Sequence, residues 1–335
     1  MEDRSLEEML ALMEDQSPEE ICFWTPLQEE RAKAVRAVVD DLKGYWPVTV
    51  RQIHYRLVEQ RPTWFKSSLK NPTPYENTIK HYQDLSRVLK WMRIGKRLKW
   101  SVLTDRTRRV SAKRGFEDLH EFIDQELDVF FSGYDRCLVQ SQDVYVELWV
   151  EKDALSSVFE NVAYPFCLRV VTRRGYNSVT AEADYYQRAK GALNKGQTPV
   201  VLYFGDFDPS GNDMLRASLN TLQNQMGLRQ LETIRVALTK DQIKSYGLPP
   251  KPGAAKRTDP RYKDYVKKHG DSAWELDALH PRELGKIARS AIQSVLDMDN
   301  FEAEEIQEEK DRERLSQFRE RLMDMITREV EGFFN

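Results

Sequence analysis

The stretch TPVVLYFGDFDPSGND, residues 198–213, decides the fold class and raises the first question about function. It opens with an apolar run of the kind that forms a strand buried on both faces of a sheet. Asp206 and Asp208 follow, one residue apart, where the apolar run ends. Asp208-Pro209-Ser210-Gly211 has the residues that a type I turn prefers. Two interpretations are therefore possible: an acidic surface turn, or the end of a strand that binds a metal ion.

Strands and helices alternate on both sides of this stretch. Strands are expected at DVYVELWVE (143–151), FCLRVVT (166–172), TPVVLYFGDFD (198–208) and TIRVAL (233–238), with helices at 153–163, 178–194 and 212–226. Such alternation predicts a mainly parallel sheet with right-handed crossovers. Binding sites of such sheets lie at the carboxyl ends of the strands, where Glu151, Asp206 and Asp208 all fall.

The first third of the chain has a different pattern. Residues 1–43 look helical, first acidic and then amphipathic. Thr49 is a good N-cap for a helix in TVRQIHYRLVEQ, and NTIKHYQDLSRVLKWMRIG (77–95) has the apolar spacing of a second helix. RLKWSVLTD (97–105) then reads as a strand, and this order of elements predicts a winged-helix module.

The chain is therefore expected to be an α/β protein with an additional α-rich part, divided into five segments. These are an N-terminal helical segment (1–43), a winged-helix domain (44–115), a linker helix (116–139), a metal-binding α/β domain (140–300) and a C-terminal amphipathic helix (301–335). Within the α/β domain, the Gly/Pro/Lys-rich residues 246–272 read as a DNA-facing loop, and 272–298 as a return to helix.

Composition limits the cellular location. The apolar fraction is 40% and the mean hydropathy is −0.65, and no apolar run is long enough for a membrane span. The acidic N-terminus does not resemble a secretory signal. Cys22, Cys137 and Cys167 lie far apart in the sequence and read as reduced thiols, so a cytoplasmic, nucleoid-associated protein without a membrane partner is expected.

Basic residues are concentrated between positions 87 and 114, although the net charge of the chain is −3. The candidates for DNA binding are Arg87, Lys90, Arg93, Lys96, Arg97, Lys99, Arg106 and Arg108. A solvated helix face is the simpler interpretation of such a run. Because this run crosses several expected elements and includes Trp91 and Trp100, contact with the phosphate backbone of double-stranded DNA is favoured.

Three carboxylates could converge on one cation. In an extended segment, residues two apart point the same way, so Asp206 and Asp208 would present both carboxylates to one side. Glu151, at the end of a neighbouring strand, would supply a third oxygen ligand. Oxygen ligands without Cys or His indicate a hard ion, Mg²⁺ or Mn²⁺.

Several of these segments resemble one family. VEKDAL (150–155), RRGYNSV (173–179) and GDFDPSG (205–211) resemble the Toprim domain of the DNA topoisomerase VI A subunit and of its relative that makes meiotic double-strand breaks. TVRQIHYRLV (49–58) resembles the motif around the catalytic tyrosine in the CAP-like winged-helix domain of that family. Together with DRTR (105–108) and WELDAL (274–279), these motifs look most like the free-standing "mini-A" relatives, and the resemblance covers about residues 45–300.

The resemblance implies a mechanism. Tyr55 would attack a DNA phosphodiester to give a 5′-phosphotyrosyl link, with Arg51 stabilising the phenolate and His54 in a lesser role. The family acts as a homodimer in which the tyrosine of one subunit works with the metal of the other, so double-strand breaks are implied. Religation is left open, as is a separate ATPase B-type subunit, because this chain has no Walker-type motif of its own.

Simpler interpretations stand beside these roles. Tyr55 could be a half-buried core residue, and Asp213 the first-turn acid of a helix rather than a metal ligand. Lys152 could contact DNA phosphate, while Glu275 and Asp277 could approach the metal or only order their own segment. Two other functions stay open: a Toprim nuclease that hydrolyses DNA with a metal-bound water, and a non-catalytic DNA-binding protein that keeps the fold.

Overall fold

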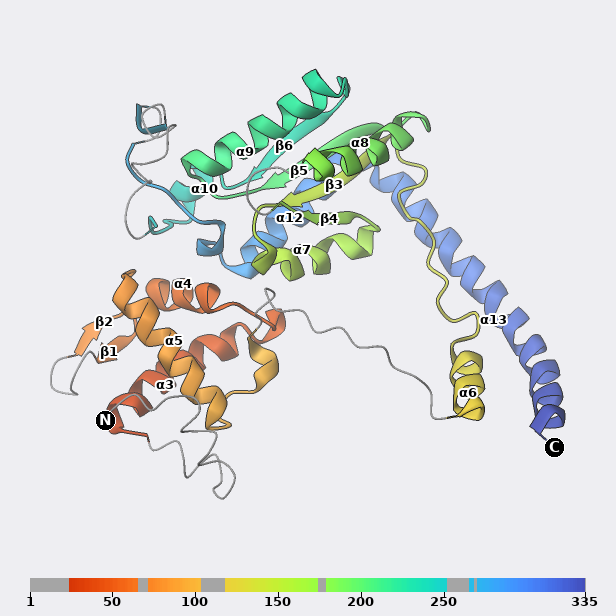
Figure 1. Cartoon of the computed structure of the whole chain (residues 1–335), viewed down its shortest axis with the longest axis horizontal. Coiled ribbons are helices and arrows are strands. Elements are labelled where there is room, and N and C mark those ends of the chain that lie inside the picture. The colour runs from red at the N-terminus through yellow and green to blue at the C-terminus, as the bar shows by residue number, and fades with distance from the viewer. Residues whose placement is uncertain are drawn as a thin grey trace.

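The structure, a computed structural model, describes residues 24–65, 72–103, 118–173, 179–251, 265–267 and 270–334. Figure 1 shows a helical N-terminal body, an α/β body and a long C-terminal helix that extends away from both. Arg106, Arg108, residues 1–23, most of RRGYNSV and most of the 246–272 connection lie outside the described residues.

Three helices and a short hairpin form the N-terminal body. The helices are α3 (Pro26–Asp41), α4 (Val50–Gln60) and α5 (Ile79–Ile94), and the strands are β1 (Thr63–Phe65) and β2 (Pro72–Pro74). Thr25 and Thr49 each close a capping box with the glutamine three residues later, which fixes where α3 and α4 begin. Apolar faces of the helices meet in a core that includes Val35, Leu57 and Leu89.

Two local predictions for this body are wrong. Residues 100–102 form a 3₁₀ turn, η2 (Trp100–Val102), and only Leu103 makes a bridge, to Val48, so no strand runs through the described part of 97–105. A hairpin instead occupies the connection between α4 and α5, where no strand was predicted. The buried Trp64 anchors this hairpin against Tyr75, an aromatic contact that the polar local sequence does not reveal.

The α/β body confirms the predicted parallel sheet. Its strands are β3 (Val144–Val150), β4 (Arg169–Thr172), β5 (Thr198–Phe204) and β6 (Glu232–Ala237), paired in the order β4-β3-β5-β6, with every pair parallel. The central strand β5 alternates between two cores. Leu202 and Phe204 face one core and Val201 and Tyr203 face the other, as expected for a strand covered on both sides.

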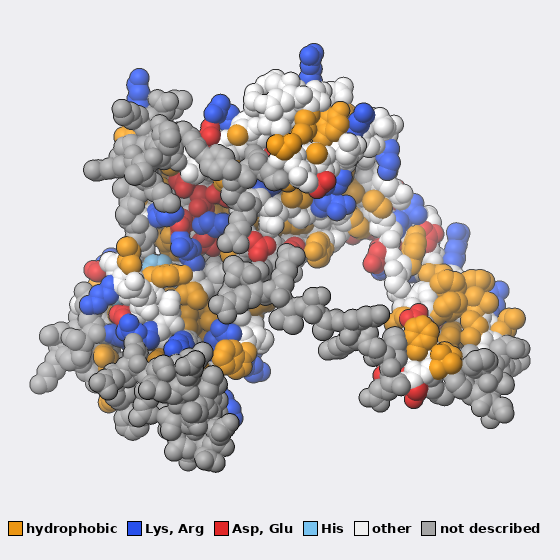
Figure 2. Space-filling model, viewed as in Figure 1, with side chains coloured by type: hydrophobic (Ala, Val, Ile, Leu, Met, Phe, Trp, Pro, Cys, Tyr) orange, Lys and Arg blue, Asp and Glu red, His pale blue; other side chains and the backbone are white. Residues whose placement is uncertain are grey.

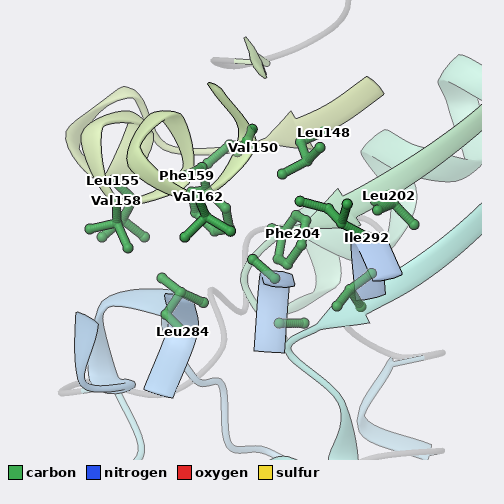
Figure 3. Packing of buried hydrophobic residues seen from close by; sticks show 14 of the residues in the cluster. Leu148, Val150, Leu155, Val158, Phe159, Val162, Leu202, Phe204, Leu284 and Ile292 are labelled. Atoms are coloured by element: carbon green, nitrogen blue, oxygen red, sulfur yellow. The ribbon is translucent and has the colours of Figure 1, made fainter. Parts of the chain in front are cut away.

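Helices cover both faces of the sheet (Figure 1). On one face lie α7 (Ser156–Ala163) and α12 (Pro281–Val295), whose buried side chains pack on β3 and β5 as Figure 3 shows. On the other face lie α8 (Val179–Leu193), α9 (Pro209–Leu219) and the π-helical turn η5 (Asn220–Gln225). The short α10 (Lys240–Ser245) follows β6, while η3 (Asp153–Leu155) and η4 (Tyr164–Phe166) flank α7.

The expected return to helix over 272–298 is only partly correct. Trp274 bridges to Phe207, and the 3₁₀ turn η6 (Leu276–Ala278) precedes α12, which begins at Pro281. Proline fits the first helical position because its missing N–H would be unbonded there. The WELDAL segment is therefore irregular backbone packed beside the carboxyl ends of the strands.

The chain ends in a helical arm. The helix α13 (Met298–Phe334) begins three residues before the predicted position and runs for 37 residues, and α6 (Leu119–Val129) lies against its distal half (Figure 1). Arg136 anchors the segment after α6 to α13 through Glu304 at 2.5 Å and Asp311 at 3.0 Å. In the described ranges, no helix is both long and apolar enough to cross a membrane.

Candidate functional site

Glu151 and Asp206 meet at the carboxyl edge of the sheet, directly after the neighbouring strands β3 and β5. The Glu151 Oε2 atom accepts a hydrogen bond of 2.9 Å from the backbone N–H of Asp206. Two glycines make room for this contact. A Cβ atom at Gly205 would lie 2.7 Å from Glu151 Oε2, and one at Gly211 would lie 2.6 Å from the Asp206 carbonyl oxygen.

Asp206 and Asp208 have different surroundings despite their spacing. The Asp206 side chain is buried, and its Oδ1 accepts a 2.8 Å hydrogen bond from the backbone N–H of Leu276. Asp208 is the N-cap of α9, and its Oδ1 accepts a 2.7 Å hydrogen bond from the N–H of Gly211. The Asp-Pro-Ser-Gly segment is therefore the start of a helix, and it holds Asp208 at the strand end.

These carboxyl groups lie in a region with an excess of negative charge. Burial, followed by repulsion from Asp206 and Asp208, raises the pKa of Glu151 to about 7. Burial also raises the pKa of Asp206, although the ammonium group of Lys152 acts in the opposite direction. A cation near Glu151 would relieve this repulsion.

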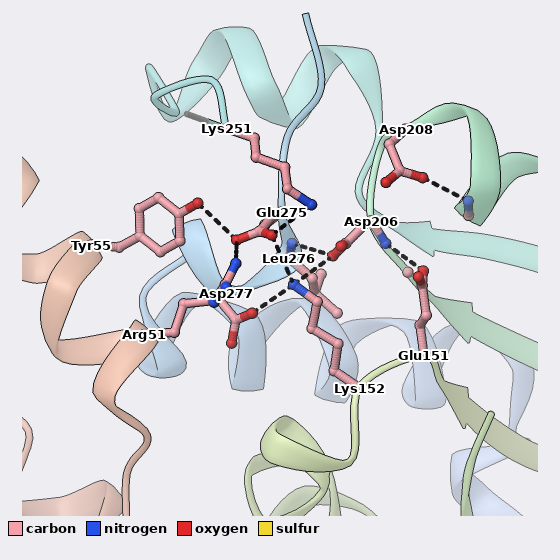
Figure 4. Close-up of polar contacts among 12 residues, drawn as sticks. Arg51, Tyr55, Glu151, Lys152, Asp206, Asp208, Lys251, Glu275, Leu276 and Asp277 are labelled. Carbon is pink, nitrogen blue, oxygen red and sulfur yellow. Dashed lines mark hydrogen bonds and ion pairs between the residues drawn. The ribbon is translucent and has the colours of Figure 1, made fainter. Parts of the chain in front are cut away.

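Lys152 lies at the centre of a second group of acids. Its Nζ atom is 3.0 Å from Asp206 Oδ1, 2.6 Å from Asp277 Oδ2 and 3.9 Å from Glu275 Oε1 (Figure 4). Burial on its own lowers the pKa of Lys152, but the three carboxylates outweigh that effect and raise it above its ordinary value. Lys152 is thus a half-buried, charged partner of the acids, and its ammonium group is engaged by them rather than by DNA in this arrangement.

Glu275 connects the two bodies of the molecule. Its carboxylate pairs with Arg51 from α4 and, at 3.0 Å, with Lys251, while the Tyr55 hydroxyl donates a 2.9 Å hydrogen bond to its Oε2. Although burial acts to raise it, the pKa of Glu275 falls to about 2 because Lys152, Arg51 and Lys251 stabilise the anion. Glu275 therefore remains ionised at neutral pH.

Tyr55 points from α4 toward this acid cluster of its own chain, whereas the resemblance implies that it works with the metal of the other subunit. The side chains of Arg51 and Tyr55 both reach Glu275, because residues four apart on a helix lie on one face. Tyr55 is 2% exposed, and burial together with the Glu275 carboxylate raises the pKa of the phenol well above its usual value. In this arrangement the hydroxyl keeps its proton.

His54 points elsewhere and has a structural environment. Its Nδ1 lies 2.7 Å from the Tyr75 hydroxyl and its Nε2 lies 3.0 Å from Asn77 Oδ1, so it ties α4 to the segment before α5. Burial lowers the pKa of His54, and the Tyr75 hydroxyl that it contacts donates a 3.1 Å hydrogen bond to the carbonyl oxygen of His81. No contact with the Tyr55 hydroxyl is among those described.

Asp213 and two basic residues complete the surroundings. Asp213 pairs with Arg216 at 2.5 Å on the first turns of α9, in keeping with its simpler interpretation. Arg235, on β6, donates a 2.6 Å hydrogen bond to the Asp206 carbonyl oxygen. Sequence reasoning missed both Arg235 and Lys251, because one lies inside an expected strand and the other in a Pro-rich connection, and neither belongs to a motif.

The predicted DNA-binding residues that the structure describes differ in their exposure and in the side chains they contact. Arg87, Lys90, Lys96 and Lys99 are exposed. Arg97 instead makes a bidentate pair with Glu29 at 2.6 Å, and the Arg93 guanidinium lies over the Trp100 ring at 4.3 Å. The exposed lysines are thus the members of the run that best fit contact with phosphate.

Carboxylates at this edge of the sheet suit Mg²⁺ or Mn²⁺ in chemistry, since both ions prefer oxygen ligands. Burial and the neighbouring acids raise the pKa of Glu151, so a cation bound nearby would stabilise its ionised form. Among the described residues, however, no three acidic, His or Cys side chains already surround a single ion position. Glu151, Asp206 and Asp208 would therefore have to reorient to hold one ion.

Comparison of the chain with models of protein families, with curated proteins and with solved structures finds no match.

Proposed function

We propose that this chain is a Mg²⁺-dependent DNA-cleaving enzyme of the kind that the resemblance to the topoisomerase VI A subunit implies. One observation carries the proposal. Tyr55 and Arg51 from the N-terminal body lie against Glu275, in the same cluster of charged groups as Asp206 and Glu151 from the two strand ends. A nucleophile, a guanidinium and oxygen ligands for a cation are the components that phosphodiester transesterification needs.

In the proposed reaction, the Tyr55 oxygen attacks phosphorus and forms the phosphotyrosyl bond while the bond from phosphorus to the 3′ oxygen breaks. The phenolic proton leaves Tyr55, and the 3′ oxygen departs with a proton as a free hydroxyl. Arg51 would stabilise negative charge on the phenolate and on the phosphate. A Mg²⁺ ion held by Glu151, Asp206 and Asp208 would supply charge stabilisation at phosphoryl oxygens.

The finer features of the resemblance belong to the same proposal. We assign the α/β body to a Toprim-like domain and the N-terminal body to a winged-helix-like domain, with Lys90 of α5 and Lys96 and Lys99 after it in contact with DNA. A homodimer with two such sites would cut both strands, with religation and a B-type ATPase partner as further steps. The hairpin between α4 and α5 departs from the expected helix, loop, helix, strand order.

A second function is favoured by a specific observation. Tyr55 is buried, and its pKa is raised rather than lowered, which is unlike an activated nucleophile. A hydrolytic Toprim nuclease, in which the tyrosine is structural and a metal-bound water attacks, accommodates this buried, protonated tyrosine. A non-catalytic DNA-binding protein would need neither a reactive tyrosine nor a bound metal ion.

One assay separates the three functions. Supercoiled plasmid is incubated with the protein and Mg²⁺ or Mn²⁺, quenched with denaturant, and run with and without protease. We expect broken DNA that enters the gel only after proteolysis, and its loss in Tyr55→Phe but not in Tyr134→Phe, whose hydroxyl contacts Asp311 in the arm. Protein-free breaks made by Tyr55→Phe would establish the nuclease, and intact plasmid under all conditions would establish the binding protein.

A further inference from the structure

Trp100 is a large aromatic side chain in contact with solvent on the N-terminal body. The structure describes all seven tryptophans of the chain, and among them only Trp100 is exposed, with an exposed fraction of 62%. A single exposed apolar side chain is ordinary on a protein surface. The contacts of this ring and the charges of its segment, however, give it a specific binding chemistry.

Arg93 of α5 covers one face of the Trp100 ring. Its guanidinium carbon lies 4.3 Å from the ring centroid, and its Nη2 atom donates a 3.4 Å hydrogen bond to the Trp100 carbonyl oxygen. The Nε atom of Arg93 is buried and has no hydrogen-bond partner among the described residues. Burial also lowers the pKa of Arg93. Because the guanidinium occupies one face of the ring, the opposite face remains available to a ligand.

The backbone that carries Trp100 is fixed to the core of the N-terminal body. Trp100 begins the turn η2, and the carbonyl oxygen of the buried Val102 in that turn accepts a 2.9 Å hydrogen bond from the N–H of Val48. The next residue, Leu103, forms a bridge to the same Val48. A ring that is held in place before binding loses less conformational entropy when a ligand stacks on it.

Three exposed lysines belong to the same part of the chain. Lys96 and Lys99 precede Trp100 in its own segment, and Lys90 lies on α5, the helix that also carries Arg93. Figure 2 shows Lys and Arg side chains next to hydrophobic ones on the N-terminal body. Proteins bind single-stranded nucleic acid with this combination, since cations attract the phosphates and an aromatic ring stacks on a base. In an intact duplex both faces of a base are stacked on its neighbours, so only an unpaired base can offer a face to such a ring.

We propose that Trp100 stacks on an unpaired base of DNA, so that the chain binds duplexes with a bulged base more tightly than fully paired ones. The base lies on the open face of the ring, opposite Arg93, while Lys96 and Lys99 neutralise the flanking phosphates. The inference rests on the DNA binding that belongs to the proposed function, but it requires neither cleavage nor a metal ion.

Binding of fluorescently labelled DNA in EDTA tests the proposal without cleavage. The probes are a duplex with one central unpaired adenine, the same duplex with an abasic site in place of that adenine, and the fully paired duplex. We expect wild type to bind the adenine bulge most tightly. Trp100→Ala should weaken binding of the adenine bulge roughly 5- to 150-fold, the usual range for loss of base stacking on an aromatic side chain, and should leave binding of the abasic bulge nearly unchanged.

The controls separate stacking from other effects. The abasic bulge keeps the flexibility of the bulged duplex but has no base to stack, so it reports recognition of DNA shape alone. Trp100→Phe keeps an aromatic ring and should retain part of the preference for the adenine bulge. Tyr164→Ala removes an aromatic side chain of matched exposure, 63%, from the α/β body and should bind all three probes as wild type does. Circular dichroism verifies that each variant is folded.

Two kinds of failure are distinguishable. Equal affinity of wild type for the three probes, or an equal loss of affinity for all three in Trp100→Ala, would overturn the inference and leave the proposed function standing. Absence of binding to any of the probes would overturn the inference together with the DNA binding on which the proposed function depends.

Discussion

The Tyr55 hydroxyl donates a 2.9 Å hydrogen bond to Glu275, a carboxylate 220 residues further along the chain. This contact joins helix α4 to the turn η6 and so couples the N-terminal body to the acid cluster of the α/β body (Figure 4). Glu275 is held ionised by three cations, and Tyr55 is held protonated beside it. The same geometry that positions the tyrosine thus keeps it in its resting form.

Glu275 should contribute stability that depends on pH. Its pKa in the folded protein is about 2, below the ordinary value, so its contribution is present above about pH 4.5 and is lost as the pH falls toward 2. At about 1.4 kcal/mol per pKa unit, a shift from 4.5 to about 2 contributes on the order of 3–4 kcal/mol. Urea unfolding should show Glu275→Gln strongly destabilised at pH 7, with a smaller difference from wild type at pH 3.

Glu305→Gln is the control for this measurement, because Glu305 is an exposed acid on α13. Its free energy of unfolding should stay within about 0.5 kcal/mol of wild type at both pH values. If Glu275→Gln lowers the free energy of unfolding by the same amount at pH 7 and at pH 3, the ionised carboxylate of Glu275 does not have the stabilising role assigned to it.

Removal of the Glu151 charge should stabilise the metal-free protein. Its pKa is raised to about 7, so folding costs free energy once the unfolded chain ionises near pH 4.5, and the full cost applies above pH 7. In EDTA at pH 8, Glu151→Gln should therefore unfold at a higher temperature than wild type, by a margin worth about 1–3 kcal/mol. Below pH 4 the two proteins should unfold alike.

Addition of Mg²⁺ at pH 8 should reverse that order. An ion that binds only the folded state raises its stability, and wild type retains the Glu151 ligand that the variant lacks. Glu232→Gln, an exposed site on β6, should respond to Mg²⁺ as wild type does. If Mg²⁺ raises the unfolding temperature of Glu151→Gln and of wild type equally, Glu151 is not a metal ligand.

Lys152 should be more important for stability than an ordinary surface lysine. Lys152→Met leaves the buried Asp206, Asp277 and Glu275 without their shared cation, and loss of one partner of a buried ion pair costs about 3–5 kcal/mol. Addition of Asp277→Asn should recover part of this loss by removing one stranded charge. Chemical denaturation of the two proteins, with the exposed-site variant Lys190→Met as control, measures both effects.

The exposed lysines of α5 and of the segment after it should set the salt dependence of DNA binding. The combined change Lys90→Glu, Lys96→Glu and Lys99→Glu should reduce the slope of log K against log salt by about 0.9 for each DNA phosphate that the variant no longer neutralises. Arg97 is left unchanged because its reversal would break the pair with Glu29. Reversal of Lys190, Lys195 and Lys244, exposed elsewhere, should leave the slope unaltered, and equal slopes for both sets would place the DNA on another surface.

Much of the fold is determined by local sequence pattern. The apolar run of 198–204 predicts β5, and Thr49 as an N-cap predicts where α4 begins. The direction of the strands then places Glu151 and Asp206 at one edge of the sheet. These features depend on neighbours in sequence and on the period of each element, which a single sequence contains.

The contacts that define the candidate site depend on residues far apart in the chain, and only the tertiary structure decided them. Arg51, Lys152, Lys251 and Glu275 come from four separate segments, and packing of α4 against η6 brings Arg51 to Glu275. The sequence predicted a strand at 97–105 and missed the hairpin around Trp64 for the same reason. Short elements are stabilised by burial against distant partners, and the charge on a buried group depends on which partners surround it, so neither can be derived from local pattern.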